Sequence, residues 1–213
     1  MKRFIFLLTI FIFSLAKVNA QNIQYALRLG ANATNGSLSS TRYSSDSKFL
    51  PGGYVGVQMK VFFDPPIYFN PQLNIIHKGT EFMVRNNDTV KLKLEINQIQ
   101  LAPYLQVDFH KKGEPGFNIN GGLSLYTAIN GKETITKSDG ITTKKDMRFS
   151  KTAYGRFEAG IHLGVGYDVK KISIQLMYNR GFSNLFNGDN SSDFSGPVIK
   201  MHSVSLGLAW YLN

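Results

Sequence analysis

Apolar and polar side chains alternate along this chain in eight segments that begin after residue 20. In the first segment Ile23, Tyr25 and Leu27 fall on one face, and Gln24 and Arg28 fall on the other. A strict period of two over this length predicts a β-strand. The alternating segments are residues 23–32, 54–63, 67–75, 99–109, 117–126, 157–168, 172–179 and 203–212.

The connections between these segments alternate in length. Short connections lie at 64–66, 110–115 and 168–171, and long polar ones lie at 34–50, 79–93, 130–154 and 184–198. Short turns on one side and long loops on the other are typical of a barrel that spans a membrane. We therefore predict an all-β, eight-stranded, antiparallel up-and-down transmembrane β-barrel with its long loops facing outward from the cell.

The composition of the two faces favours lipid on the apolar side. That side carries almost no charge, and the other is rich in Gln, Asn, Ser, Gly and Tyr with few Lys or Glu. Aromatic residues gather near the short turns, as a membrane girdle requires; they are Phe62, Phe63, Phe109, Phe117, Tyr167, Trp210 and Tyr211. The alternative fold is a soluble periplasmic barrel similar to lipocalins, with the apolar face inward around a small apolar ligand.

Two features interrupt the alternation. Residues 92–96 carry their apolar side chains in the opposite phase, which predicts a bulge near Asn97 or a stretch that lies beyond the lipid. Pro71 and Pro103 fall inside strands and lack the N–H that a strand ladder uses. A closed barrel has no edge strand for a proline, so we expect a bulge or a missing ladder bond at each.

The first 20 residues have the pattern of a secretory signal peptide. Lys2 and Arg3 precede an apolar run over residues 4–16, and residues 18–20 form a small-residue cleavage site. We expect a signal peptide at 1–20 and one barrel domain at 21–213. The formal net charge of +10 falls to +7 without the leader. Nucleic acid is not an expected partner of an exported chain, whereas anionic lipid headgroups are.

The polar face predicts a network of side chains that fills the lumen, because eight strands enclose only enough space for side chains. The predicted members are Arg28, Gln58, Lys60, Gln72, Gln100, Gln106, Glu158, His162 and Gln175. A buried charge must be paired, so we expect Glu158 to pair with Arg28 or Lys60. A narrow ion pathway is the alternative to this packed lumen.

Candidate catalytic chemistry is sparse. A lipid A-modifying enzyme needs a nucleophilic serine beside a histidine near the outer leaflet. Of the four histidines, His110 lies on the short-turn side, His162 faces the lumen beside small glycines, and His77 has no serine near it in sequence. His202 is followed by Ser203, but successive strand residues face opposite ways. The histidines also lack metal-ligand spacing, and the chain has no cysteine. We therefore expect no catalytic residues, no metal site and no cofactor, and keep a lipid A-modifying enzyme as an alternative function.

The stretch 130–154 is rich in basic residues that are candidates for weak anion binding. They are Lys132, Lys137, Lys144, Lys145, Arg148 and Lys151. Phosphates of outer-leaflet lipopolysaccharide are a plausible ligand for such a group. The alternative is an ordinary solvated loop.

The chain resembles the PorT-like outer-membrane β-barrel family of Gram-negative bacteria over most of its length. The segments that carry the resemblance are 29–32, 53–57, 69–73, 77–79, 101–105, 160–167 and 178–181. The last strand resembles the signal that the barrel-assembly machinery reads during insertion. Ser205, Gly207, Trp210 and Leu212 match that signal, and Asn213 adds one residue past its usual end.

The resemblance implies a location in the cell outer membrane and leaves the role open, because family members differ in function. We expect a structural or interaction role: envelope integrity, surface-loop binding, or assistance to secretion machinery. The expected partners are outer-membrane lipid and lipopolysaccharide, the barrel-assembly machinery during insertion, and other envelope proteins.

Overall fold

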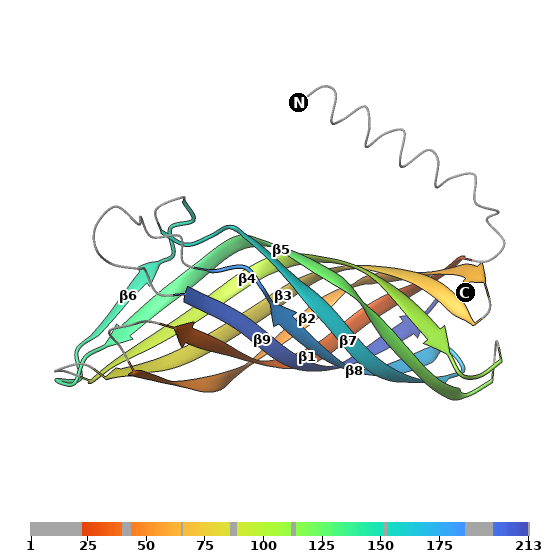
Figure 1. Cartoon of the computed structure of the whole chain (residues 1–213), viewed down its shortest axis with the longest axis horizontal. Helices are drawn as coiled ribbons and strands as arrows, with labels where there is room; N and C mark the ends of the chain where they lie inside the picture. The colour runs from red at the N-terminus through yellow and green to blue at the C-terminus, as the bar shows by residue number, and fades with distance from the viewer. Residues whose placement is uncertain are drawn as a thin grey trace, which may run out of the picture.

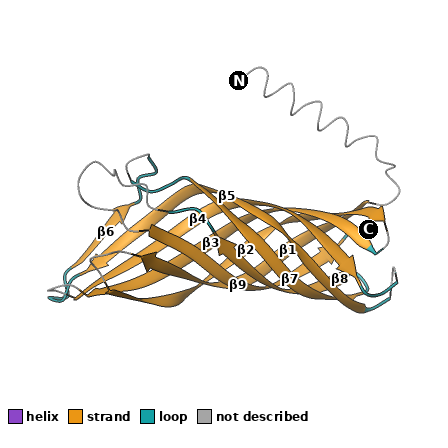
Figure 2. Ribbon diagram, in the orientation of Figure 1, coloured by secondary structure: helices purple, strands orange, loops and turns teal. Residues whose placement is uncertain are grey.

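A computed structural model describes residues 23–39, 44–64, 66–85, 89–111, 114–150, 153–185 and 198–212, which form one antiparallel sheet curled into a barrel (Figures 1 and 2). The leader predicted at 1–20 lies outside these residues. The strands are β1 (Ile23–Ser39), β2 (Ser44–Asp64), β3 (Ile67–Arg85), β4 (Thr89–Asp108), β5 (Gly116–Thr136), β6 (Thr142–Asp146), β7 (Phe157–Val169), β8 (Ile172–Gly181) and β9 (Val198–Tyr211).

The sheet has nine strands among the described residues, one more than predicted. β1 pairs with β9 and β4 pairs with β5, which closes the barrel wall. The additional strand, β6, pairs only with β5, from Lys132↔Asp146 to Thr136↔Thr142. It lies at the end of the barrel opposite the C-terminus (Figure 1). All five of its residues are exposed and none is apolar, so no apolar alternation indicated a strand there.

The facing of the side chains is that of a membrane barrel. β8 alternates without interruption, with Gln175 1% exposed toward the lumen and Leu176 48% exposed on the outer wall. This facing is opposite to that of the lipocalin-like alternative. Phe109, Phe117 and Trp210 of the predicted girdle are exposed. The prediction that Tyr211 belongs to the girdle is wrong, because its side chain is buried in the lumen. The described residues contain no helix of the length and hydropathy needed to cross a membrane.

The strands are longer than a bilayer requires. A transmembrane strand needs about 9–11 residues, and β2 and β5 each have 21. The outward apolar residues of β3 end at Ile75, and a polar row follows. In that row His77 Nδ1 lies 2.8 Å from Asn97 Oδ1, and Asn97 donates to Asn130 over 2.7 Å.

Beyond this row the strands continue as what we call the outer extension, residues 33–39, 44–51, 79–85, 89–95, 131–136 and 142–146. Much of the sequence predicted as the loops 34–50, 79–93 and 130–154 is therefore paired strand. The alternation of apolar and polar side chains is reversed in this part of β4. Leu94 in the outer extension and Ile96 next to it point inward and are fully buried. Residues 186–197 of the fourth predicted loop lie outside the described residues.

Both predicted irregularities have a counterpart in the pairing. The register of β4 with β5 shifts between Asn97 and Gln98, and the extra residue is Ile129 of β5. Pro71 and Pro103 lie directly opposite each other in β3 and β4. On their other sides the prolines have no paired residue: Pro71 has none in β2, and Pro103 has none in β5. The register of each strand pair is the same before and after the proline. A missing ladder bond, rather than a bulge, accommodates the prolines.

Candidate functional site

The lumen is filled by side chains from all sides of the barrel wall, and Arg28 lies at its centre. Its guanidinium donates hydrogen bonds to Gln72 and, over 3.0 Å, to Gln175, and it lies 5.2 Å from the ring centroid of Tyr54. Arg28 makes no ion pair within the described part of the chain. The predicted Arg28–Glu158 pair is therefore wrong, and amide oxygens solvate this cation instead.

Glu158 pairs with a lysine that the sequence did not assign to the lumen. Lys78 Nζ lies 3.5 Å from Glu158 Oε2, with side chains 2% and 7% exposed. Gln98 donates to the same oxygen over 3.1 Å, and the Lys78 ammonium lies 3.3 Å from the ring centroid of Tyr126. Lys78 lies beyond the predicted end of its strand, which is why it was missed.

Lys60 also pairs differently from the prediction. Its ammonium lies 2.6 Å from Asp108 Oδ2 and 3.5 Å from Asp168 Oδ2, at the end of the barrel formed by the short turns. Both aspartates have the inward phase and lie beside predicted short turns, but the sequence did not show which charges of the lumen meet there. The lumen thus holds two ion-paired clusters, one at each end, separated by the amide network around Arg28.

His162 is held as a structural residue rather than as a base. Its Nδ1 and Nε2 atoms lie 3.0 and 3.1 Å from the amide oxygens of Asn179 and Asn120. Its ring stacks on Tyr104 at a centroid distance of 5.2 Å. In the described structure, none of the four histidines has a serine among its hydrogen-bond partners. The serine–histidine pairing of a lipid A hydrolase is therefore not found there.

The outer end of the lumen is closed by an apolar cluster that the sequence did not predict. Its residues are Phe82, Leu94, Ile96, Ala128, Met147, Tyr154, Leu185, Ile199 and Met201. Residues 147–150 and 153–155 lie at this end, held by hydrogen bonds from Met147 N to Gly131 O and from Gly155 N to Leu185 O. Burial, with Glu133 nearby, raises the pKa of the Tyr154 hydroxyl, which therefore stays protonated.

The centre of the lumen leaves no room for a water-filled channel. The void beside Arg28 and His162 has a volume of about 10 Å³, which is about the space that one water occupies.

We therefore expect the refolded protein to produce no steady conductance in a planar lipid bilayer. A barrel with a continuous aqueous path would give resolved current steps under the same voltage. Such steps, scaling with salt concentration, would contradict the packed lumen and favour the narrow ion pathway.

The basic residues of 130–154 are distributed over both faces of the β5–β6 hairpin. Lys144 and Lys145 are successive strand residues, so they point to opposite faces. Lys132 is flanked by Glu95 and Asp146, whereas Lys144 lies beside Thr134. Lys137 and Arg148 are exposed outside the strands, and Lys151 lies outside the described residues. Anion binding by the whole group stays a prediction.

The predicted insertion signal has two faces. Ser205 and Gly207 of β9 point into the lumen, and Trp210 and Leu212 are exposed on the outer wall. The ring of Tyr54 fills the space that side chains at Gly30 and Gly207 would occupy. The glycine of the signal therefore has a packing role at the seam where β9 closes onto β1.

The comparisons with known proteins agree with this architecture. The sequence matches the family model described as outer membrane protein beta-barrel domain over residues 19–187. A comparison with curated proteins finds no match. The PorT-like level of the resemblance is finer than this family and stays a prediction.

Several solved outer-membrane barrels are similar in fold. OprG from Pseudomonas aeruginosa has 12% identity and a TM-score of 0.49, covering 89% of this chain and 96% of that chain. Ail of Yersinia pestis, solved with the heparin analogue sucrose octasulfate, has 10% identity and a TM-score of 0.45, covering 90% and 100%. The protease OmpT from Escherichia coli has 11% identity and a TM-score of 0.40, covering 91% and 98%. At these values the likeness carries no argument about activity.

Proposed function

Because the chain belongs to the family of outer membrane protein β-barrel domains and is located in the outer membrane, we propose that it is a non-conducting surface protein with a structural or interaction role. The observation that carries the proposal is the contrast between a packed lumen and an outer extension built from paired strands. A barrel without an aqueous path acts through the surfaces it presents, and the extension is a paired-strand surface outside the apolar band.

We propose lipopolysaccharide phosphate as the ligand of one part of this surface. Lys91, Lys93 and Lys144 lie around the hydroxyls of the paired residues Thr134, Thr136 and Thr142, and we call these six residues the lysine–threonine patch. Ammonium and hydroxyl groups are donors suited to phosphate oxygens. Lys132 is left out of the patch because both of its strand neighbours, Glu95 and Asp146, are acidic. Lys93 also pairs with Glu95, over 2.8 Å, but its strand neighbour in β5 is Thr134.

The height of the patch fits the headgroup level of the outer leaflet. Lys93 lies four residues beyond Asn97, the β4 residue in the polar row above the apolar band. Four residues of strand extend about 13 Å, and a strand tilt of about 45° converts this into a height of about 9 Å. Each headgroup layer is about 5–7 Å thick, so the backbone of the patch lies near the outer edge of that layer.

Replacing Lys91, Lys93 and Lys144 with Gln is expected to lower retention of the refolded protein on immobilised lipopolysaccharide about tenfold at low salt, since exposed charge pairs are screened by salt. A matched control replaces Lys137, Lys145 and Arg148 with Gln. These three substitutions remove the same amount of positive charge, but outside the patch. Equal losses in both variants would mean that general charge, and not the patch, is responsible. Unchanged retention in the patch variant would refute the proposed ligand.

The PorT-like resemblance implies a more specific interaction role, which is assistance to secretion machinery, and we include it in this proposal. Its support is the set of matching segments, including Pro71 and Pro103, which the barrel accommodates opposite each other. We propose no catalytic role, because the histidines are engaged by amides, carboxylates and aromatic rings.

A further inference from the structure

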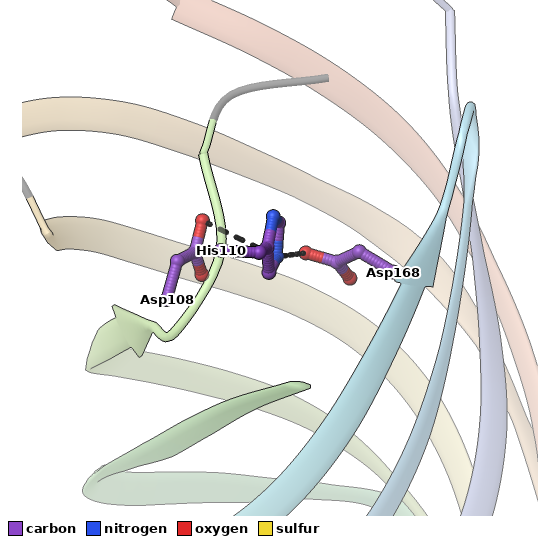
Figure 3. A group of neighbouring side chains, drawn as sticks. All are labelled: Asp108, His110 and Asp168. Atoms are coloured by element: carbon purple, nitrogen blue, oxygen red, sulfur yellow. Dashed lines mark hydrogen bonds and ion pairs between the residues drawn. The ribbon is translucent and has the colours of Figure 1, made fainter. Parts of the chain in front are cut away.

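Three metal-ligand side chains converge at the end of the barrel formed by the short turns. Asp108 ends β4, His110 follows it in the turn to β5, and Asp168 lies near the end of β7. Figure 3 shows the imidazole between the two carboxylates. His110 Nε2 lies 3.3 Å from Asp168 Oδ2 and 4.0 Å from Asp108 Oδ2. The three ligand atoms all lie within 4.8 Å of one another.

The imidazole is oriented so that a lone pair faces the carboxylates. His110 Nδ1 lies 3.0 Å from the Lys111 carbonyl oxygen, which can only accept, so Nδ1 carries a proton and donates it. In the neutral ring the other nitrogen, Nε2, is then an acceptor. An acceptor that faces two carboxylate oxygens is repelled by them. The Lys60 ammonium offsets part of this repulsion because it lies against the same two oxygens. A metal ion between the three groups would accept the Nε2 lone pair and both carboxylates.

The carboxylates are held by amides in the manner of metal ligands. Gln106 donates to Asp108 Oδ1 over 2.6 Å, and Asn118 donates to Asp168 Oδ1 over 3.0 Å. These bonds leave the Oδ2 atom of each aspartate directed at His110. A carbonyl on the distal histidine nitrogen and hydrogen bonds on the distal carboxylate oxygens are the usual support of a metal site.

From this geometry we propose that Asp108, His110 and Asp168 bind a first-row transition-metal ion such as Zn²⁺ at this end of the barrel. Mixed imidazole and carboxylate ligands suit Zn²⁺, and bonds of about 2.0–2.2 Å place tetrahedral ligands about 3.3–3.6 Å apart. The observed separations need only small side-chain movements to reach this. The fourth position faces a cavity of about 160 Å³ that Glu114 also lines.

Lys60 is the intramolecular competitor of the metal. Its ammonium lies 2.6 Å from Asp108 Oδ2 and 3.5 Å from Asp168 Oδ2, the oxygens that the metal would use. It is further held 4.4 Å from the ring centroid of Tyr68. A metal ion must displace this ammonium toward the cavity, so the lysine lowers the affinity and its removal raises it. A purely structural salt-bridge cluster predicts no such gain.

The test is titration of the full chain, refolded in detergent, with Zn²⁺ in a calorimeter. We expect one ion per chain, a loss of affinity of about tenfold or more for His110→Ala and Asp168→Asn, and no change for His202→Ala. Lys60→Met should bind about tenfold more tightly. Each variant is first checked for the gel shift on heating that marks a folded barrel, and Lys60→Gln replaces Lys60→Met if the latter does not fold.

Absorption of Co²⁺ in place of Zn²⁺ reports the ligands directly. Visible bands of a nitrogen–oxygen site that vanish in His110→Ala are the expected result. No binding by the native chain would overturn the proposed site. Equal binding by native protein and His110→Ala, or weaker binding by Lys60→Met, would also overturn the site.

Discussion

Lys78→Met is expected to destabilise the barrel by about 3–5 kcal/mol, because it leaves a buried carboxylate without its partner. The ammonium of Lys78 lies 3.5 Å from Glu158 Oε2, and both side chains are almost completely buried. Among the described residues, the amide of Gln98, at 3.1 Å, would remain as the hydrogen-bond donor to this charge. The free energy of unfolding in urea, followed through the emission of Trp210, the single tryptophan, measures the loss.

Two further variants separate the pair from its surroundings. Lys78→Met combined with Glu158→Gln removes both charges and should recover most of the lost stability, since no uncompensated ion remains. Lys93→Met breaks an exposed pair, with Lys93 Nζ 2.8 Å from Glu95 Oε1, and should change stability by less than about 1 kcal/mol. A double variant as unstable as Lys78→Met would contradict the ion-pair explanation.

The facing and order of the membrane strands could be predicted because they depend only on local alternation. In lipid the apolar side chains turn outward, and each strand shows this independently of its neighbours. The pairing partners of charged residues could not be predicted in this way. Arg28 and Glu158 share the inward phase, but the height of each in the lumen is set by the register around the whole barrel.

The outer extension was missed for a related reason. Outside the membrane the solvent is water, so the same physical rule turns apolar side chains inward and polar ones outward. Leu92, Leu94 and Ile96 therefore invert the phase of the membrane strands. From the sequence, this reversal predicted a bulge or a stretch beyond the lipid, but it did not show that the strands stay paired there. The reversal itself is the signal, because it marks where the strand passes from lipid into water.

The convergence of Asp108, His110 and Asp168 had no local signal either. Asp108 and His110 are two residues apart in one segment, but Asp168 lies near the end of another strand, β7. The pairing of β5 with β7, which places Asp168 opposite Gly116, brings these residues together. A search by ligand spacing along the chain finds sites within one hairpin and does not find sites between two turns.

Gly207→Ala is expected to destabilise the barrel by about 1–3 kcal/mol through overpacking. A methyl group at Gly207 would overlap the hydroxyl of Tyr54 and lie 3.0 Å from its Cζ atom. The Tyr54 ring also lies close to Gly30 on the neighbouring strand, where an added Cβ would be only 2.6 Å from the ring. The ring therefore has little room to move away from Gly207. Unfolding in urea again measures the effect. Gly121→Ala is the control, since the nearest atom there is the mobile end of Leu163 at 3.0 Å.

Tyr54→Phe distinguishes packing from recognition by the insertion machinery. Removing the hydroxyl relieves the closest overlap, so Gly207→Ala should be less harmful in the Tyr54→Phe background than in the native one. Arg28 lies 3.4 Å from that hydroxyl, so Tyr54→Phe alone should lose little. Refolding into lipid vesicles without any machinery should show the same rescue. If Gly207→Ala refolds normally in vesicles but fails to insert in cells, the glycine is read as part of the insertion signal and the packing explanation is wrong.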